Sequence, residues 1–106
     1  MRFNNMNYKR LVVKYNLAIL DEDVKKCKVL KLALNKINAV VDAIEDDTNN
    51  LILRELMNEV SVIDIADKLK ISRNSVYCRI NRHLLGKIKT IKEIAESAFY
   101  LHENDL

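Results

Sequence analysis

Residues 61–85 read SVIDIADKLKISRNSVYCRINRHLL and predict two short helices joined by a tight turn. Ser61 is placed to cap the first helix, and Asp64 stands where a reciprocal capping box has an acid. The apolar residues of this helix recur at i, i+3, i+4 and i+7, which gives one buried stripe. They are Val62, Ile65, Ala66 and Leu69.

The turn is formed by residues 70–72, in which Ile71 is expected to be buried and Ser72 to cap the second helix. The second helix then presents one inner row at i, i+4 and i+8: Val76, Ile80 and Leu84. Two short helices around a tight turn, the second with one apolar row, are the pattern of a helix-turn-helix. In that motif the second helix lies in the major groove of DNA.

The composition indicates an all-α protein that forms a single compact domain. The chain has 106 residues, of which 49% are hydrophobic, with one Gly and no Pro. So few helix breakers favour helices almost throughout. Two cysteines are too few for a disulfide framework, and a reduced cytoplasm is the compartment that we expect. The sequence contains no apolar run long enough for a membrane span and no signal peptide at its N-terminus.

Charge is divided unevenly along the chain. Residues 42–67 contain eight acids and one base, whereas residues 68–92 contain eight bases and no acid. Such a run is compatible with an ordinary solvated helical face. We favour phosphate contact, because the acid-free block begins at the turn of the predicted motif.

The flanking sequence predicts a helical N-terminal arm at residues 1–47, a DNA-binding head at 48–87 and an amphipathic C-terminal helix at 88–106. Within the arm we expect helices over Tyr8–Leu20 and from Val24 to about Glu45. Asp46–Asn50 is expected to be a loop, with Asp47 or Thr48 capping a short helix that ends at Met57. We expect Gly86 to end or bend the recognition helix.

The second helix of the arm carries a coiled-coil-like row with alternating spacings of three and four residues. Its members are Cys27, Leu30, Leu34, Ile37, Val41 and Ile44. This row either packs within its own chain, against the first helix and the head, or forms the seam of a dimer. We expect a homodimer through the N-terminal helices, because two heads on a symmetric site roughly add their binding energies. The C-terminal helix from Ile88 is the rival dimer surface.

The run DIADKLKISRNSVYCRINRHL resembles the end of sigma-70 region 4 and the small sigma-like activators. The matching positions are Ile65-Ala66, Leu69, Ile71-Ser72, Val76, Arg79-Ile80 and Arg82. The longer stretch from about Leu30 resembles the phage late-gene activators of the RinA/ArpU type. The resemblance implies a sequence-specific regulator, encoded by a phage or mobile element, that activates transcription. The family usually has Gly at the turn where this chain has Lys70, and the chain has nothing like sigma region 2.

Helical geometry predicts which side chains meet double-stranded DNA. The outer face of helix 73–85 carries Asn74, Cys78, Asn81 and Arg82. Asn74 is placed to read adenine, and Ser75 is a further candidate for the same role. Arg82 fits either a guanine or a phosphate. The residues better suited to positioning on phosphates are Lys70, Ser72, Arg73, Tyr77 and Arg79.

The sequence provides no catalytic, metal or cofactor motif, so we do not expect an enzyme. His83 falls beside the buried row and is expected at the edge of the core. The alternative to a DNA-reading regulator is a protein-interaction module that docks on RNA polymerase or another partner without reading DNA. A small terminase-type DNA-packaging subunit is a further alternative, since those proteins also carry helix-turn-helix heads.

Overall fold

The computed structural model describes residues 6–104, with side chains as far as Tyr100, and every regular element in that part is helical. The elements are α1 (Tyr8–Leu20), α2 (Val24–Asp42), α3 (Asp47–Met57), α4 (Val62–Leu69), α5 (Arg73–Arg79), the π-helical segment η1 (Ile80–Leu84) and α6 (Leu85–Asn104). The all-α prediction is confirmed. Residues 1–5 and 105–106, at the ends of the predicted arm and C-terminal helix, lie outside the described residues.

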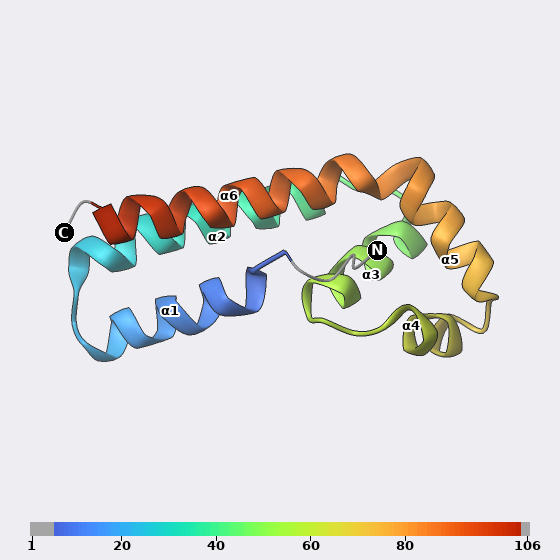
Figure 1. Cartoon of the computed structure of the whole chain (residues 1–106), viewed down its shortest axis with the longest axis horizontal. Helices are drawn as coiled ribbons and strands as arrows, with labels where there is room; N and C mark the ends of the chain where they lie inside the picture. The colour runs from blue at the N-terminus through green and yellow to red at the C-terminus, as the bar shows by residue number, and fades with distance from the viewer. Residues whose placement is uncertain (1–5, 105–106) are drawn as a thin grey trace.

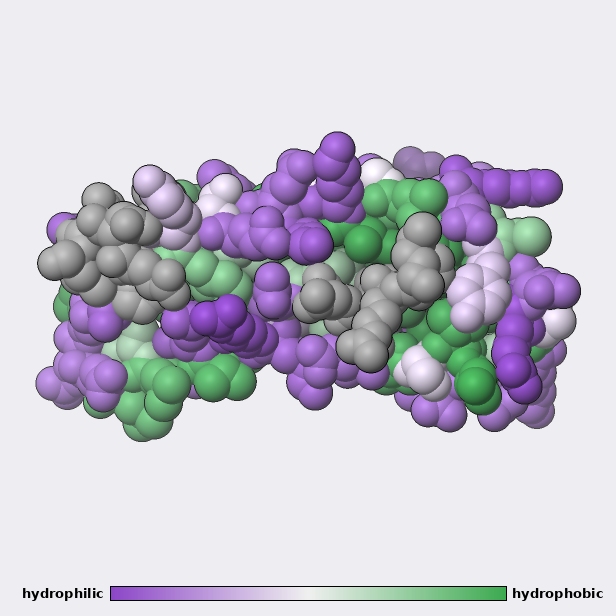
Figure 2. Space-filling model, viewed as in Figure 1, coloured by the Kyte–Doolittle hydropathy of each residue, from purple (hydrophilic) through white to green (hydrophobic). Residues whose placement is uncertain are grey.

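The helices form an elongated body of 46 × 24 × 22 Å (Figure 1). In one half, α6 lies along α2 and α1 packs against both; α3, α4 and α5 gather at the other end. Hydrophilic side chains cover much of the face in Figure 2, but hydrophobic surface runs along its lower left edge, over α1. The chain therefore has a three-helix body and a head, which the α2–α3 connection and the run from α5 into α6 join together.

The apolar row of α2 is covered within the chain. Leu30, Ile37 and Val41 are fully buried, and the remaining three members are half-buried and pack against the same core. The covering elements are mainly α6 and α1. This corresponds to the first of the two interpretations of the row, except that α6, rather than the head, is the principal neighbour. The row is thus not available as the seam of a dimer.

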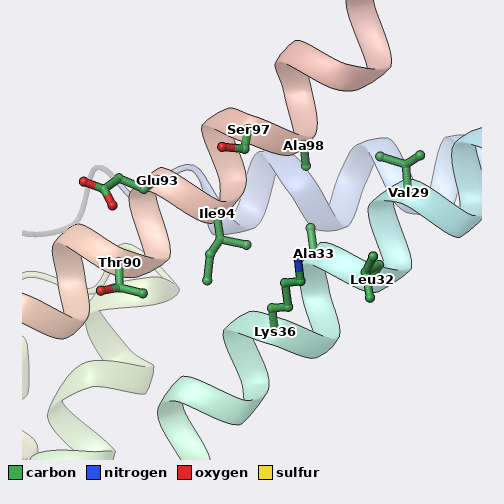
Figure 3. A pocket seen from close by; sticks show the side chains of 9 residues that line it. All are labelled: Val29, Leu32, Ala33, Lys36, Thr90, Glu93, Ile94, Ser97 and Ala98. Atoms are coloured by element: carbon green, nitrogen blue, oxygen red, sulfur yellow. The ribbon is translucent and has the colours of Figure 1, made fainter. Parts of the chain in front are cut away.

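The three-helix body is further held by contacts between α1 and α6. The guanidinium of Arg10 lies 4.7 Å from the centre of the Phe99 ring, and Lys14 Nζ lies 5.5 Å from it. Both distances suit cation–π attraction. Along the opposite side of α6, a groove of about 300 Å³ lies between the packed helices α6 and α2 (Figure 3). Its lining includes Val29, Leu32 and Ala33 of α2 and Ile94 and Ala98 of α6.

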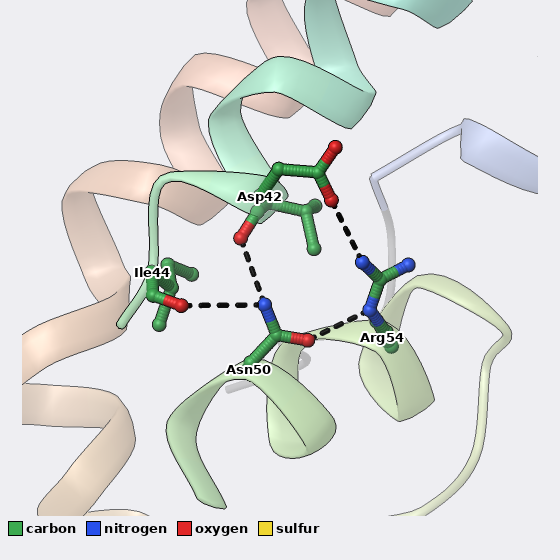
Figure 4. A network of polar contacts seen from close by, with 5 residues as sticks. Asp42, Ile44, Asn50 and Arg54 are labelled. Carbon is green, nitrogen blue, oxygen red and sulfur yellow. Dashed lines mark hydrogen bonds and ion pairs between the residues drawn. The ribbon is translucent and has the colours of Figure 1, made fainter. Parts of the chain in front are cut away.

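A polar network fastens the end of α2 to α3 (Figure 4). The Asn50 side-chain amide donates to the carbonyl oxygens of Val41, at 2.9 Å, and Ile44, at 3.5 Å. Its oxygen accepts from Arg54 Nε at 2.7 Å, and Arg54 also pairs with Asp42 at 2.9 Å. The Val41 carbonyl already accepts the backbone N–H of Ile44 at 3.1 Å, so Asn50 adds a second donor there and ties the α2–α3 connection to α3.

The start of α3 was predicted wrongly. Residues 47–50 are helical rather than a loop, and the cap is Asp46, which accepts the backbone N–H of Asn49 at 2.9 Å. Asp, Thr and Asn are frequent both in loops and in the first turn of a helix, so their composition did not separate the two. α2 also ends at Asp42, three residues before the expected end. At the next corner the left-handed residue is Glu59, with a φ of 64°.

Gly86 does not end the recognition helix. The run from Arg73 to Asn104 is continuous, and its irregularity is the π-helical segment η1, which lies before Gly86. Figure 1 shows the run changing direction between α6 and α5. π segments widen one turn and are a recognised cause of such bends. A single helical Gly costs only about 1 kcal/mol, which the burial of Leu84 and Ile91 on either side outweighs.

Lys70, which stands where the resemblance would place Gly, has a left-handed conformation, with φ 56° and ψ 42°. Because a side chain in this region is strained by about 1–2 kcal/mol, Lys70→Gly should raise the free energy of unfolding by about 0.5–1 kcal/mol, after the entropy that Gly adds to the unfolded chain. Chemical denaturation measures this change. Lys89→Gly, at an exposed position inside α6, is the control and should lower stability by about 1 kcal/mol. A loss of stability in both variants would contradict the strain at Lys70.

Candidate nucleic-acid interface

Helices α4 and α5 are short, and side-chain caps start both of them. Ser61 Oγ accepts the backbone N–H of Asp64 at 3.2 Å, and Ser72 Oγ accepts that of Ser75 at 3.1 Å. Ser72 also donates its hydroxyl to Ser75 Oγ at 3.0 Å. Both predicted caps are confirmed. Each cap satisfies a backbone donor that the helix leaves open, so Ser61 fixes the start of α4 and Ser72 fixes the end of the turn, where α5 begins.

The inner row of the second helix is buried as predicted. Val76, Ile80 and Leu84 are all inaccessible to solvent, and Ile65 and Ala66 of α4 are buried with them. Ile71 is half-buried and packs against the same core. This packing anchors α5 along one side, so the orientation of its opposite side is determined by the core.

Nine of the ten predicted contact residues are exposed on this opposite side and on the turn. They are Lys70, Ser72, Arg73, Asn74, Ser75, Tyr77, Cys78, Asn81 and Arg82. The surface contains donors, acceptors and positive charge without an acid among its members. We refer to these nine residues as the α5 surface.

Arg79 is the exception, because its side chain points towards the start of α3. Its NH1 donates to Asn49 Oδ1 at 3.1 Å and to Asp46 Oδ1 at 3.3 Å, and 38% of its side chain is exposed. In the free chain Arg79 therefore links α5 to the first turn of α3, and its contact with phosphates stays a prediction. Asn49, which is only 6% exposed, is a polar residue that the sequence interpretation had assigned to a loop.

The Asp46 carboxylate both caps α3 and pairs with Arg79. The backbone N–H of Asn49 holds the pKa of the Asp46 carboxyl below its ordinary value of 3.8, and the positive charge of Arg79 acts in the same direction against partial desolvation. The carboxylate is therefore ionised at neutral pH while it caps α3 and attracts Arg79. No pattern in the sequence alone pairs Asp46 with a residue 33 positions away.

Some of the bases in residues 68–92 form ion pairs within the chain. Lys68 pairs with Glu55 of α3 at 3.0 Å, and Arg79 pairs with Asp46, so two of its eight bases are bound to acids of the preceding segment. Six bases remain for an external partner: Lys70, Arg73, Arg82, Lys87, Lys89 and Lys92. The acidic segment thus contributes to holding the head together through Glu55 and Asp46.

His83 is exposed, so its expected position at the edge of the core is wrong. The physical reason is the π segment: a π turn contains more residues than an α turn, which rotates His83 away from the buried row while Leu84 returns to it. The two thiols are free, Cys78 exposed on the α5 surface and Cys27 half-buried in α2.

Among the described residues, no three His, Cys, Asp or Glu side chains are grouped as a metal site would need. Within the same part of the chain, no helix has the length and apolar character to span a membrane. Comparisons with known protein families, with curated protein sequences and with solved structures found no match.

Proposed function

We propose that this protein is a sequence-specific DNA-binding regulator of transcription that inserts the helical run 73–85 into the major groove. The observation that carries the proposal is the two-sided character of this run. One side is locked into the core by Val76, Ile80 and Leu84, and the other presents Asn74, Asn81 and Arg82 to solvent. A recognition helix needs both sides, because base readout requires a rigidly held row of donors and acceptors.

The chemistry of the α5 surface supports a division of tasks. Asn74 and Arg82 have the side chains that pair bidentately with adenine and guanine. Lys70 and Arg73, at the turn and the start of α5, are suited to the phosphates on either side. Activation of phage-type genes, and contact with RNA polymerase, are the versions of this function that the resemblance to sigma-like activators favours.

A binding titration at several salt concentrations tests the proposal. We expect the chain to bind fragments of its own genome, with a slope of log K against log salt of about −0.9 for each phosphate contact. Three contacts, from Lys70, Arg73 and Arg82, correspond to a loss of roughly 40-fold between 50 and 200 mM salt, and six contacts to roughly 2,000-fold. Failure of the folded chain to bind any fragment at about 50 mM salt would favour the protein-docking alternative.

Arg82→Met should weaken DNA binding at least about fivefold at low salt and reduce the slope by about one contact. The matched control is Lys28→Met, which removes an exposed positive charge from α2, in the other half of the molecule. This control should leave both the affinity and the slope close to the wild-type values. Equal effects of the two substitutions would indicate unspecific attraction to positive charge and not a defined surface.

A further inference from the structure

Helix α1 has a second apolar side that no other described helix covers. Its inner side contributes Leu11 and Ala18 to the core. Its outer side presents Val13, Leu17 and Leu20, at i, i+4 and i+7, which are 55%, 53% and 78% exposed. A stripe with this spacing lies along one side of the helix, as the contact stripe of a helix packed against another helix does.

The stripe is part of a larger apolar area. Val24, the first residue of α2, is 65% exposed and follows Leu20 after the short α1–α2 turn. Figure 2 shows the resulting hydrophobic surface at the lower left, over α1. Single exposed apolar residues are ordinary in proteins, whereas a contiguous group of them is typical of a contact site.

The charges at the two ends of α1 indicate which partner fits this surface. Lys9 lies in the first turn, and Asp21 and Glu22 directly follow the last turn. When two copies of such a helix lie antiparallel, the basic end of each meets the acidic end of the other. The surface is therefore complementary to itself, which is the property that a two-fold symmetric interface requires.

We propose that this protein forms a homodimer in which α1 of one copy packs antiparallel against α1 of a second copy. If the two-fold axis passes beside the midpoint between Val13 and Leu17, residue n faces residue 30 − n of the other copy. Val13 then packs against Leu17 of the second copy, and Lys9 lies beside Asp21 of the second copy. Each pair occurs twice because of the symmetry.

This interface replaces the seam that the sequence suggested. The apolar row of α2 is buried under α1 and α6, while the outer stripe of α1 is exposed in the single chain. Because α1 lies in the half of the molecule away from α5, the two heads stand at opposite ends of the dimer (Figure 1). The proposal does not depend on DNA binding, since the mass of the free protein tests it.

The first test is sedimentation or light scattering of the full chain without DNA. We expect a monomer–dimer equilibrium, and Leu17→Asp should raise the dissociation constant at least tenfold. Since Leu17 is exposed, circular dichroism should show an unchanged fold. Leu32→Asp, at a 56% exposed position on α2, is the control and should leave the dissociation constant unchanged. A chain that stays monomeric at all concentrations, or a dimer indifferent to Leu17→Asp, would overturn the proposal.

The second test exchanges the charges at the two ends of α1. Lys9→Glu and Asp21→Lys should each weaken the dimer roughly 5- to 30-fold, because each introduces two like-charge pairs. Both changes agree with the helix dipole, so neither should weaken α1 itself. An equimolar mixture of the two variants should restore the wild-type dissociation constant as a heterodimer, because both of its pairs then have opposite charges. A mixture that associates no better than either variant alone would exclude the antiparallel arrangement.

Discussion

Replacing Ile37 with alanine is expected to lower the free energy of unfolding by about 3 kcal/mol. Ile37 lies on α2 in the row that α1 and α6 cover, and none of its surface is exposed. Shortening a fully buried isoleucine to alanine loses burial and leaves a cavity, which costs about 2–5 kcal/mol in protein cores. Alanine is the better helix former, so the loss would reflect packing and not helix propensity.

Urea denaturation of Ile37→Ala and Leu32→Ala measures this difference. Leu32 lies on the same helix but is 56% exposed, so its replacement should change the free energy of unfolding by no more than about 0.5 kcal/mol. The comparison also tests where the α2 row is buried. If Ile37→Ala lowered stability only slightly but dissociated a dimer, the row would be a contact between copies, contrary to the packing within the chain.

The head follows from the sequence because its determinants are local. Within 25 positions the sequence shows a serine before each helix, an apolar residue at every third or fourth position and a turn of three residues. The structure accordingly has caps at Ser61 and Ser72 and a buried row at Val76, Ile80 and Leu84. The left-handed Lys70 lies where the sigma-like proteins that this run resembles usually have glycine.

Local sequence could not predict which elements bury the apolar row of α2. The apolar spacing in α2 states that one side is buried, but it does not identify the covering surface, which here comes from α6, more than 40 residues later. α1 illustrates the same limit. Its spacing predicts one apolar side that includes Leu11 and Ile19, but the structure buries Leu11 and leaves Ile19 48% exposed.

The candidate site shows a related limit at Arg79. Helical geometry places Arg79 on a flank of α5, where contact with DNA and contact with α3 are both possible. The choice depends on Asp46 and Asn49, which are 33 and 30 positions away. The sequence does not predict the π segment either, because Ile80–Leu84 contains no proline or glycine that would indicate an irregular turn.

Arg79→Met is expected to lower the free energy of unfolding by about 2 kcal/mol, whereas Arg82→Met should change it by less than about 0.5 kcal/mol. Removing the guanidinium leaves the oxygen of the 6%-exposed Asn49 without this donor, and an unsatisfied buried acceptor costs about 1–3 kcal/mol. The ion pair with Asp46 adds little, since the carboxylate is half exposed. Methionine matches arginine in helix propensity, and Arg82 is exposed, so its replacement removes no buried contact.

The same two variants separate a positioning role from phosphate contact. Arg79→Met should weaken DNA binding through the altered attachment of α5 to α3, with the salt slope unchanged. Arg82→Met should weaken it with a slope reduced by about one contact. Denaturation and salt titration of both proteins measure the two quantities independently. If Arg79→Met were as stable as the wild type and also reduced the slope, Arg79 would leave Asp46 and Asn49 for a phosphate when DNA is bound, and the link seen in the free chain would be a resting position for this side chain.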